Sequence, residues 1–310
     1  MRFLGVIAIR EKFQEKMRYE GTVYRPPSEA GSLIIQATIG CPHNACAFCC
    51  MYRDKRFRAR PTAEIIEDLD LAVAAYGPGV RTMFLADGNS AVLSTDRLVA
   101  IGEAARIRFP KLERITVYGS AKFLAKKSKE EWRAVVKAGI TRIHSGLESG
   151  DPATLTSITK GVTPEEAVLA YRHVLEAGIE LSVYLMIGVA GLERWREHAL
   201  GSAAVLNQAP PHFVRLRTYV PMPGTPWYER WREGRLTLLS AYDALRETRL
   251  LIEQLTGPTM LLSDHVSNFL NVGGRLPEDR DSMLAFIDEA LDWPPDRFRP
   301  PTEELIGIGL

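Results

Sequence analysis

Four cysteines lie within ten positions of this 310-residue chain, and the chain has no others. Cys41, Cys46 and Cys49 are separated by four and then two residues, and Cys50 follows directly. Thiols gathered on one short loop more often bind a metal or an inorganic cluster than pack in a core. The spacing lets three sulfurs reach one small group, and it leaves no fourth ligand at the usual offset.

Three kinds of site fit these cysteines. A structural zinc ion needs four ligands, and His43 or Cys50 could complete the set, although ligands from one short loop would stabilise little structure. An electron-carrying iron–sulfur cluster needs four cysteines, and Cys50 adjoins Cys49 too closely to reach a separate iron. The third site is a 4Fe-4S cluster held by three cysteines, with one iron open to a ligand.

The elements that must position this loop alternate along the chain. Apolar, β-rich runs at 32–38, 82–86, 114–119, 141–145, 180–187 and 212–218 predict strands. Amphipathic stretches near 62–76, 95–108, 128–138, 164–177 and 194–208 predict helices between them. This alternation predicts an α/β fold with a parallel sheet. Six units are fewer than the eight of a closed barrel, so we expect a partial, open parallel β/α barrel.

The chain divides into three regions. Residues 1–30 form a short N-terminal lead-in, and residues 31–235 contain the partial barrel. Residues 236–310 form a C-terminal extension, with helical stretches near 238–256 and 277–292, which we expect to cover the barrel mouth. The cysteine loop follows the first strand, at the carboxyl-terminal mouth where such barrels place their chemistry.

Strand periodicity predicts which side chains face the lumen. On the sixth strand Val214 and Leu216 should pack against helices, which turns Arg215 and Arg217 inward. The same alternation places further polar or large side chains inside: Gln36, Thr38, Thr116, Tyr118, His144, Ser182, Tyr184 and Met186. Buried charge without a partner is too costly to persist, so the lumen should hold water and a polar or anionic ligand. Alternatively, both arginines pair with carboxylates at the strand ends.

Net charge, hydropathy and cysteine usage limit the kinds of partner and the location that the sequence predicts. The formal net charge is +1, so we expect no nucleic acid partner, although a basic run from Arg53 to Arg60 directly follows the cysteines. No apolar stretch approaches the ~20 residues that span a bilayer, and the first residues do not resemble an export signal. Clustered cysteines without an export signal predict a cytoplasmic protein, because thiols stay reduced there.

The cysteine motif resembles that of the radical S-adenosylmethionine (radical SAM) superfamily. That motif has gaps of three and two residues and an aromatic residue before the last cysteine, the position of Phe48. The first gap here is four, which departs from the usual pattern. Together with Tyr24-Arg-Pro-Pro-Ser-Glu-Ala, the motif is similar to a branch of uncharacterised iron–sulfur oxidoreductases in that superfamily. The resemblance covers about residues 24 to 290.

The resemblance implies two cofactors, a 4Fe-4S cluster on Cys41, Cys46 and Cys49 and S-adenosylmethionine on its open iron. The loop from Asp87 to Asn89 would receive the methionine amine, and Glu148 would contact the ribose or methionine part. Taken alone, each of these motifs could be a plain turn. The implied cofactor-binding residues are Phe48, Asp87, Gly88, Asn89, Ser120, Glu148, Tyr184, Gly188, Arg215 and Arg217.

The resemblance also implies the reaction. Reductive cleavage of S-adenosylmethionine would give a 5′-deoxyadenosyl or another derived radical, acting on a small polar or anionic substrate in the lumen. Flavodoxin or ferredoxin would supply the electron. The candidate catalytic residues are Tyr118, His144, Tyr184, Asp264 and His265, and the segment 263–268 could close the lumen. Only Cys50 is left over, so a second cluster has no ligands. The alternative is a non-catalytic iron–sulfur or zinc protein that transfers electrons or acts as a sensor.

Overall fold

The computed structural model describes residues 17–299 and contains one eight-stranded sheet and one two-stranded sheet. The large sheet has the order β1-β4-β5-β6-β7-β8-β9-β10, and all its pairings are parallel except that of β9 with β10. Its strands are β1 Leu33–Gln36, β4 Thr82–Ala86, β5 Arg114–Tyr118, β6 Ile140–Glu148, β7 Glu180–Ile187, β8 Phe213–Thr218, β9 Thr259–Leu262 and β10 Gly273–Leu276. The sheet stays open between β1 and β10, which confirms the expected partial barrel.

Five long helices follow the predicted ranges to within two residues. They are α2 Thr62–Tyr76, α3 Thr95–Arg108, α5 Lys129–Lys137, α7 Pro164–Glu176 and α8 Trp195–Gln208. Ser128 and Thr163 begin α5 and α7 with capping boxes. In each box the cap hydroxyl accepts from the backbone N–H of a glutamate three residues later, and the glutamate side chain accepts from the backbone N–H of the cap residue. These local signals explain why the helix starts could be read from the sequence.

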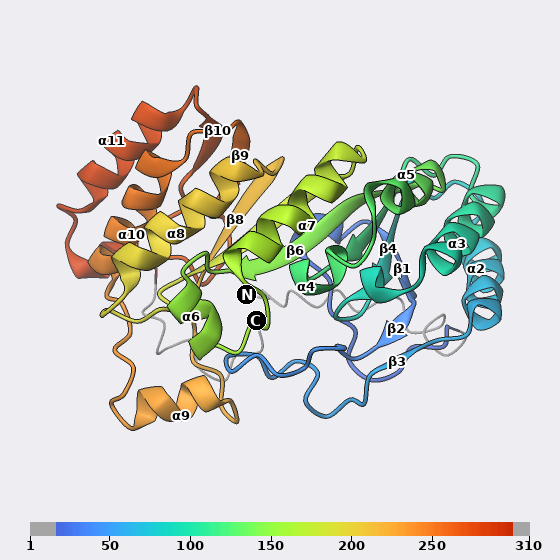
Figure 1. The fold of residues 1–310 in the computed structure, drawn as a ribbon, viewed down its shortest axis with the longest axis horizontal. Helices are drawn as coiled ribbons and strands as arrows, with labels where there is room; N and C mark the ends of the chain where they lie inside the picture. Colours follow the sequence, from blue (N-terminus) through green and yellow to red (C-terminus); the bar gives the residue numbers. More distant parts are fainter. Residues whose placement is uncertain (1–16, 300–310) are drawn as a thin grey trace.

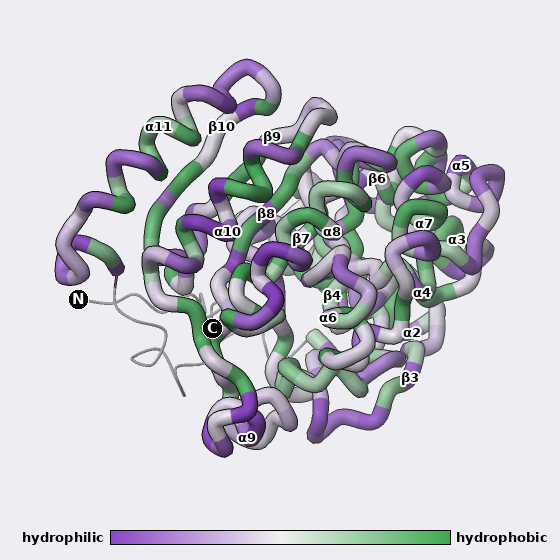
Figure 2. The backbone as a smooth tube through the Cα atoms, turned by 60° about the vertical axis from the view of Figure 1, so that its left-hand side comes forward, coloured by the Kyte–Doolittle hydropathy of each residue, from purple (hydrophilic) through white to green (hydrophobic). Residues whose placement is uncertain are grey.

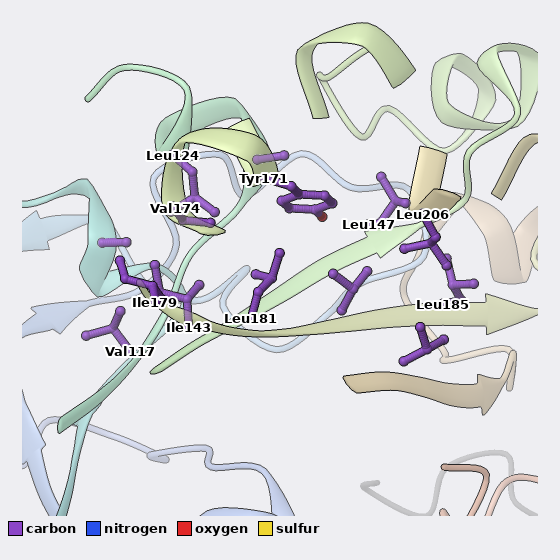
Figure 3. Packing of buried hydrophobic residues seen from close by; sticks show 14 of the residues in the cluster. Val117, Leu124, Ile143, Leu147, Tyr171, Val174, Ile179, Leu181, Leu185 and Leu206 are labelled. Atoms are coloured by element: carbon purple, nitrogen blue, oxygen red, sulfur yellow. The ribbon is translucent and has the colours of Figure 1, made fainter. Parts of the chain in front are cut away.

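The main core lies between the sheet and these helices. Figure 3 shows Ile143 of β6 and Leu181 of β7 on the side of the sheet that faces Tyr171 and Val174 of α7, and Leu185 of β7 beside Leu206 of α8. Val214 and Leu216 of β8 are also buried in this cluster. The predicted alternation of inward and outward side chains is therefore confirmed on β7 and β8. The sequence placed the end of β6 too early, because pairing with β7 continues past Gly146 through an irregularity in the register.

The C-terminal extension is only partly helical. Its helices are α10 Ala241–Gln254 and α11 Arg280–Ala290, but β9 joins the main sheet beside β8 and β10 follows it. Figure 1 shows these four elements together at one end of the molecule, and Figure 2 shows hydrophilic and hydrophobic stretches alternating along α11. The division at residues 30 and 235 stays a prediction, and part of the lead-in lies outside the described residues.

Short elements connect the strands and the long helices. The small sheet pairs β2 Thr38–Ile39 with β3 Arg58–Ala59, and the cysteine loop connects these two strands. In Figure 1 this loop, drawn in blue, extends toward α6 and α9. The remaining short helices are η1 Pro27–Glu29, η2 Ser90–Val92, α4 Ala121–Leu124, α6 Pro152–Ser157, α9 Pro226–Arg232 and η3 Pro295–Arg297. Among residues 17–299, no helix is both long enough and apolar enough to cross a membrane.

Candidate active site

The cysteine loop brings three thiols into mutual electrostatic contact. Burial, and then the thiols of Cys46 and Cys41, raise the pKa of Cys49 to about 11. Burial also raises the pKa of Cys46, again with a contribution from Cys41. Within the described residues, no three thiol, imidazole or carboxylate groups gather closely enough for a single metal ion. Thiolates are soft ligands of the kind that iron–sulfur clusters use.

A second, smaller core fixes the middle of this loop. The Ala47 N–H donates to the Ile158 carbonyl at 2.8 Å, and the Ala47 carbonyl accepts from the Trp227 N–H at 3.0 Å. The Trp227 indole N–H donates to the Val189 carbonyl at 3.1 Å. These four residues belong to one buried cluster, against which the Phe48 ring also packs. Helix α9 therefore packs against the cysteine loop, although the two segments are far apart in the sequence.

The loop after β4 lies directly against the first cysteine. A Cβ atom added to Gly88 would lie 2.8 Å from the Cys41 Cβ and 2.9 Å from the Tyr52 ring, so only glycine fits. The next residue, Asn89, is completely buried, and neither atom of its side-chain amide has a hydrogen-bond partner. A buried amide without partners is costly in a folded protein, which is typical of a group that awaits a ligand.

Asp87 holds the cysteine loop and the β4 loop together. Its Oδ2 accepts from the Gly40 N–H at 2.8 Å and from the Gln36 side chain at 3.1 Å. Its backbone has φ 75°, a left-handed conformation that non-glycine residues rarely adopt. Burial raises the pKa of Asp87, while its Oδ1 has no hydrogen-bond partner. The segment 87–89 thus combines close packing with unused polar atoms beside the cysteines.

A buried ion pair lies on the other side of the cysteine loop. The Lys160 ammonium donates to Glu148 Oε1 at 3.0 Å and lies 5.7 Å from the centre of the Phe48 ring. Burial lowers the pKa of Lys160, but the charges of Glu148 and Cys46 raise it by more, so this ammonium stays charged. Glu148 itself has φ 66°. Lys160 was not among the predicted site residues, and the only signal for it was the Lys-Gly dipeptide after α6.

Three of the predicted catalytic residues meet on the inner face of the sheet. The ring of His144 lies 6.1 Å from that of Tyr118 and 5.8 Å from that of Tyr184. Burial lowers the pKa of His144, so its ring is neutral. Its Nε2 lies 3.4 Å from Glu29 Oε1 and its Nδ1 lies 3.5 Å from the Tyr184 hydroxyl. Although burial opposes it, hydrogen bonds from His144 and Ser32 lower the pKa of Glu29 to about 2.

These contacts determine which ring nitrogen of His144 carries the proton. Because Glu29 is a carboxylate, the Nε2–H of His144 donates to it, and Nδ1 is left to accept from the Tyr184 hydroxyl. The chain Tyr184–His144–Glu29 can therefore hold or move a proton at the tyrosine oxygen, as in other base–orienter arrangements.

The two inward arginines lie beside this chain. Arg215 donates through Nε to the Ser182 hydroxyl at 3.2 Å, and the Arg217 guanidinium lies 5.1 Å from the centre of the Tyr184 ring. Neither forms an ion pair with any carboxylate of residues 17–299. The alternative that both are neutralised at the strand ends therefore does not hold for these residues.

The segment 263–268 lies against the end of β8. The Thr218 N–H donates to the Ser267 hydroxyl at 3.2 Å, and the Asn268 amide donates to the Leu216 carbonyl at 2.8 Å. Burial, and then Arg217, lower the pKa of His265 to about 4, which places this ring near the arginines. The side chain of Asp264 is exposed. The predicted covering segment thus reaches the inner face from outside the barrel core.

The last two predicted cofactor-binding positions, Ser120 and Gly188, each follow a strand of the large sheet. Ser120 precedes α4 at the end of β5, and no hydrogen bond from its hydroxyl caps that helix. Gly188, with φ 80°, follows β7, and its N–H donates to Glu247 Oε2 at 3.0 Å. The Gly188 N–H is therefore occupied, and only the rest of its backbone could face a cofactor.

Known proteins resemble this chain in part of its sequence or in its fold. A curated relative, an uncharacterized methyltransferase of Pyrococcus horikoshii, is 24% identical over 203 residues, which are 63% of this chain and 41% of the relative. This chain thus spans about two fifths of that relative's length. Methylornithine synthase (PylB) has a similar structure, with a TM-score of 0.51 and 15% identity over 83% of this chain and 68% of its own. Coproporphyrinogen III oxidase (HemN) of Escherichia coli gives a TM-score of 0.53 and 15% identity, over 72% and 52% of the two chains.

The model of the radical SAM superfamily matches residues 35–200, from β1 into α8. This range includes the cysteine loop, the Asp87–Asn89 segment and the Glu148–Lys160 pair. The chain therefore belongs to the radical SAM superfamily, whose enzymes use a 4Fe-4S cluster and S-adenosylmethionine.

Proposed function

We propose that Cys41, Cys46 and Cys49 hold the 4Fe-4S cluster and that Cys50 does not. The thiols of Cys41 and Cys46 both act electrostatically on that of Cys49, and Cys50 follows Cys49 directly in the chain. The loop is also preorganised, because the Arg53 guanidinium donates to the carbonyls of Cys49 at 2.8 Å and Cys46 at 3.1 Å.

S-adenosylmethionine would bind between the segment 87–89 and the Glu148–Lys160 pair. When bound, the reduced cluster and S-adenosylmethionine supply a 5′-deoxyadenosyl radical, a step that the cofactors carry. The chain's own residues position the ligand: the free Asn89 amide can donate and accept, Glu148 can accept from hydroxyl groups, and the Lys160 charge favours a carboxylate. The observation that carries this proposal is the contact of Gly88 with Cys41, which brings an unpartnered amide to the cysteine loop.

The substrate would be a small polar or anionic molecule on the inner face of the sheet. Arg215 and Arg217 offer guanidinium groups without carboxylate partners among residues 17–299, and a guanidinium matches a carboxylate or phosphate through two parallel hydrogen bonds. Tyr184 and His144 lie beside them and can deliver or accept a proton. The segment 263–268 is positioned to exclude water from the same region.

The decisive experiment reconstitutes the protein with iron and sulfide without oxygen, and then adds dithionite and S-adenosylmethionine. We expect 5′-deoxyadenosine, detected by mass spectrometry, and the absence of every product of S-adenosylmethionine would contradict the proposal. S-adenosylhomocysteine as the sole product would instead indicate methyl transfer, the activity named for the curated relative.

Serine variants test the ligand set, and Cys50 provides a matched control. We expect Cys41→Ser, Cys46→Ser and Cys49→Ser to lose most of the bound iron, while Cys50→Ser keeps it. Loss of the cluster from Cys50→Ser with retention in Cys41→Ser would refute the assignment. An acidic one-electron carrier such as flavodoxin or ferredoxin is the proposed reductant. The cytoplasm, where the four clustered thiols stay reduced, is the proposed location.

A further inference from the structure

A buried polar chain connects the two loops that follow β6 and β7. The Gly188 N–H donates to Glu247 Oε2 at 3.0 Å, and Glu247 Oε1 forms an ion pair with Nδ1 of His198. Nε2 of His198 lies 2.9 Å from the Glu148 carbonyl oxygen. His198 comes from α8 and is 1% exposed, and Glu247 comes from α10 and is completely buried.

The contacts fix the charge state of this chain. A carbonyl oxygen only accepts hydrogen bonds, so Nε2 of His198 must carry a proton. Nδ1 faces Glu247 Oε1, and a proton between these two atoms belongs to the imidazole when Glu247 is a carboxylate. Burial opposes this state, but the charge of Glu247 raises the pKa of His198. The chain is therefore an imidazolium–carboxylate pair whose outer ends bind only backbone groups.

Both backbone groups belong to residues in an uncommon conformation. Glu148 has φ 66° and Gly188 has φ 80°. A non-glycine residue holds the left-handed conformation only when its surroundings impose it. The His198 hydrogen bond to the Glu148 carbonyl is such a restraint, and the Glu247 bond to Gly188 ties the neighbouring loop to the same pair.

We propose that His198 and Glu247 are positioning residues for S-adenosylmethionine, acting through the backbones of Glu148 and Gly188. The inference rests on the proposed function, since that function places these two loops at the cofactor. Under this inference the C-terminal extension contributes to the cofactor site, because the Glu247 carboxylate comes from α10, which lies beyond residue 235. Neither side chain touches the cofactor region directly, so their effect should appear in cofactor affinity and leave cluster assembly unchanged.

The test compares three variants of the reconstituted protein. Glu247→Leu removes both carboxylate oxygens at similar volume, and we expect it to weaken S-adenosylmethionine binding by about tenfold or more, as loss of a buried charged hydrogen bond does. Glu247→Gln can accept from Gly188 through its oxygen and donate to a neutral His198 through its amide, so affinity should return to within about threefold of wild type. Ile252→Ala is the matched control, because it opens a cavity in the same helix at an apolar residue that is not a member of the polar chain.

Binding is measured by calorimetry, bound iron by chemical analysis, and the Glu148 and Gly188 loops by amide hydrogen exchange without cofactor. We expect faster exchange at Gly188 in Glu247→Leu alone, with equal iron in all variants. Equal affinities of Glu247→Leu and Ile252→Ala at matched melting temperatures would overturn the inference. If Glu247→Leu does not fold, Glu247→Asp, too short to reach both partners, should show the same loss, and wild-type affinity in it would overturn the inference. Failure of the wild type itself to bind S-adenosylmethionine would instead refute the proposed function.

Discussion

Replacement of Gly88 by alanine should damage the cluster site more than the fold. The added Cβ would lie 2.8 Å from the Cys41 Cβ and 3.1 Å from the Cys41 Cα, whereas carbon atoms in contact normally lie about 3.5–4.0 Å apart. Cys41 or the β4 loop must therefore move by about 0.7 Å. Cys41 is the first cysteine of the motif, so a shift of it moves a proposed cluster ligand.

The magnitude follows from two opposing effects. Overpacking of a buried site costs about 1–3 kcal/mol, and alanine recovers about 0.4–1 kcal/mol by restricting the unfolded chain. We expect a net loss of about 1–2 kcal/mol in the free energy of unfolding. Gly79→Ala is the matched control, because nothing lies within 4 Å of the place that its new Cβ would occupy and its φ is not left-handed. That variant should be as stable as wild type or slightly more stable.

Two measurements separate the variants. Urea unfolding of the protein before reconstitution gives the free energy, and iron and sulfide content after reconstitution gives cluster occupancy. Gly88→Ala should be less stable and should retain less iron, while Gly79→Ala should retain as much as wild type. Equal iron content and stability in the two variants would refute the claim that this contact sets the position of Cys41.

Three further predictions concern Asn89, Trp227 and His265. Asn89→Leu should raise the free energy of unfolding of the cofactor-free protein by about 1 kcal/mol, because it removes a buried amide without partners, yet calorimetry should show weaker S-adenosylmethionine binding. Trp227→Phe loses the bond to the Val189 carbonyl, so the protein should unfold about 0.5–1.5 kcal/mol more easily and release iron faster to a chelator. Burial, and then Arg217, lower the pKa of His265 to about 4 from an unfolded value of about 6.5, so only the unfolded chain gains a proton in this range. Stability should therefore fall as pH drops from about 6.5 to 4, and urea titrations of His265→Gln should lack that part of the slope; an unchanged slope would contradict this reasoning.

The parts of the molecule that could be predicted are those with local causes. Helix starts depend on residues within one turn, so the capping boxes at Ser128 and Thr163 gave correct positions. The side-chain alternation of β8 depends on a period of two, so it correctly turned Arg215 and Arg217 inward. The cysteine spacing also lies within one loop, and the family to which the chain belongs followed from it.

The parts that could not be predicted depend on contacts between distant segments. No sequence signal near Trp227 indicates that α9 packs against the cysteine loop. No signal near Glu247 indicates that its side chain reaches the Gly188 N–H. The strand β9 is only four residues long, and its pairing with β8 comes from the packing of the whole extension. Cysteine spacing also gave no indication that Lys160 is buried beside Cys46, because that approach is created by the turn after α6.

The packing of α9 against the cysteine loop has a consequence for the synthesis of the chain. Ala47 hydrogen-bonds to Ile158 and to Trp227, the latter about 180 residues further along the sequence. At about 5–20 residues per second, the ribosome delivers Trp227 roughly 10–40 s after Ala47. During that interval the nascent chain displays four thiols on a loop that lacks its final partners. We therefore expect iron and sulfide to be loaded after translation has passed α9, and oxygen exposure of stalled nascent chains to be more damaging than exposure of the finished protein.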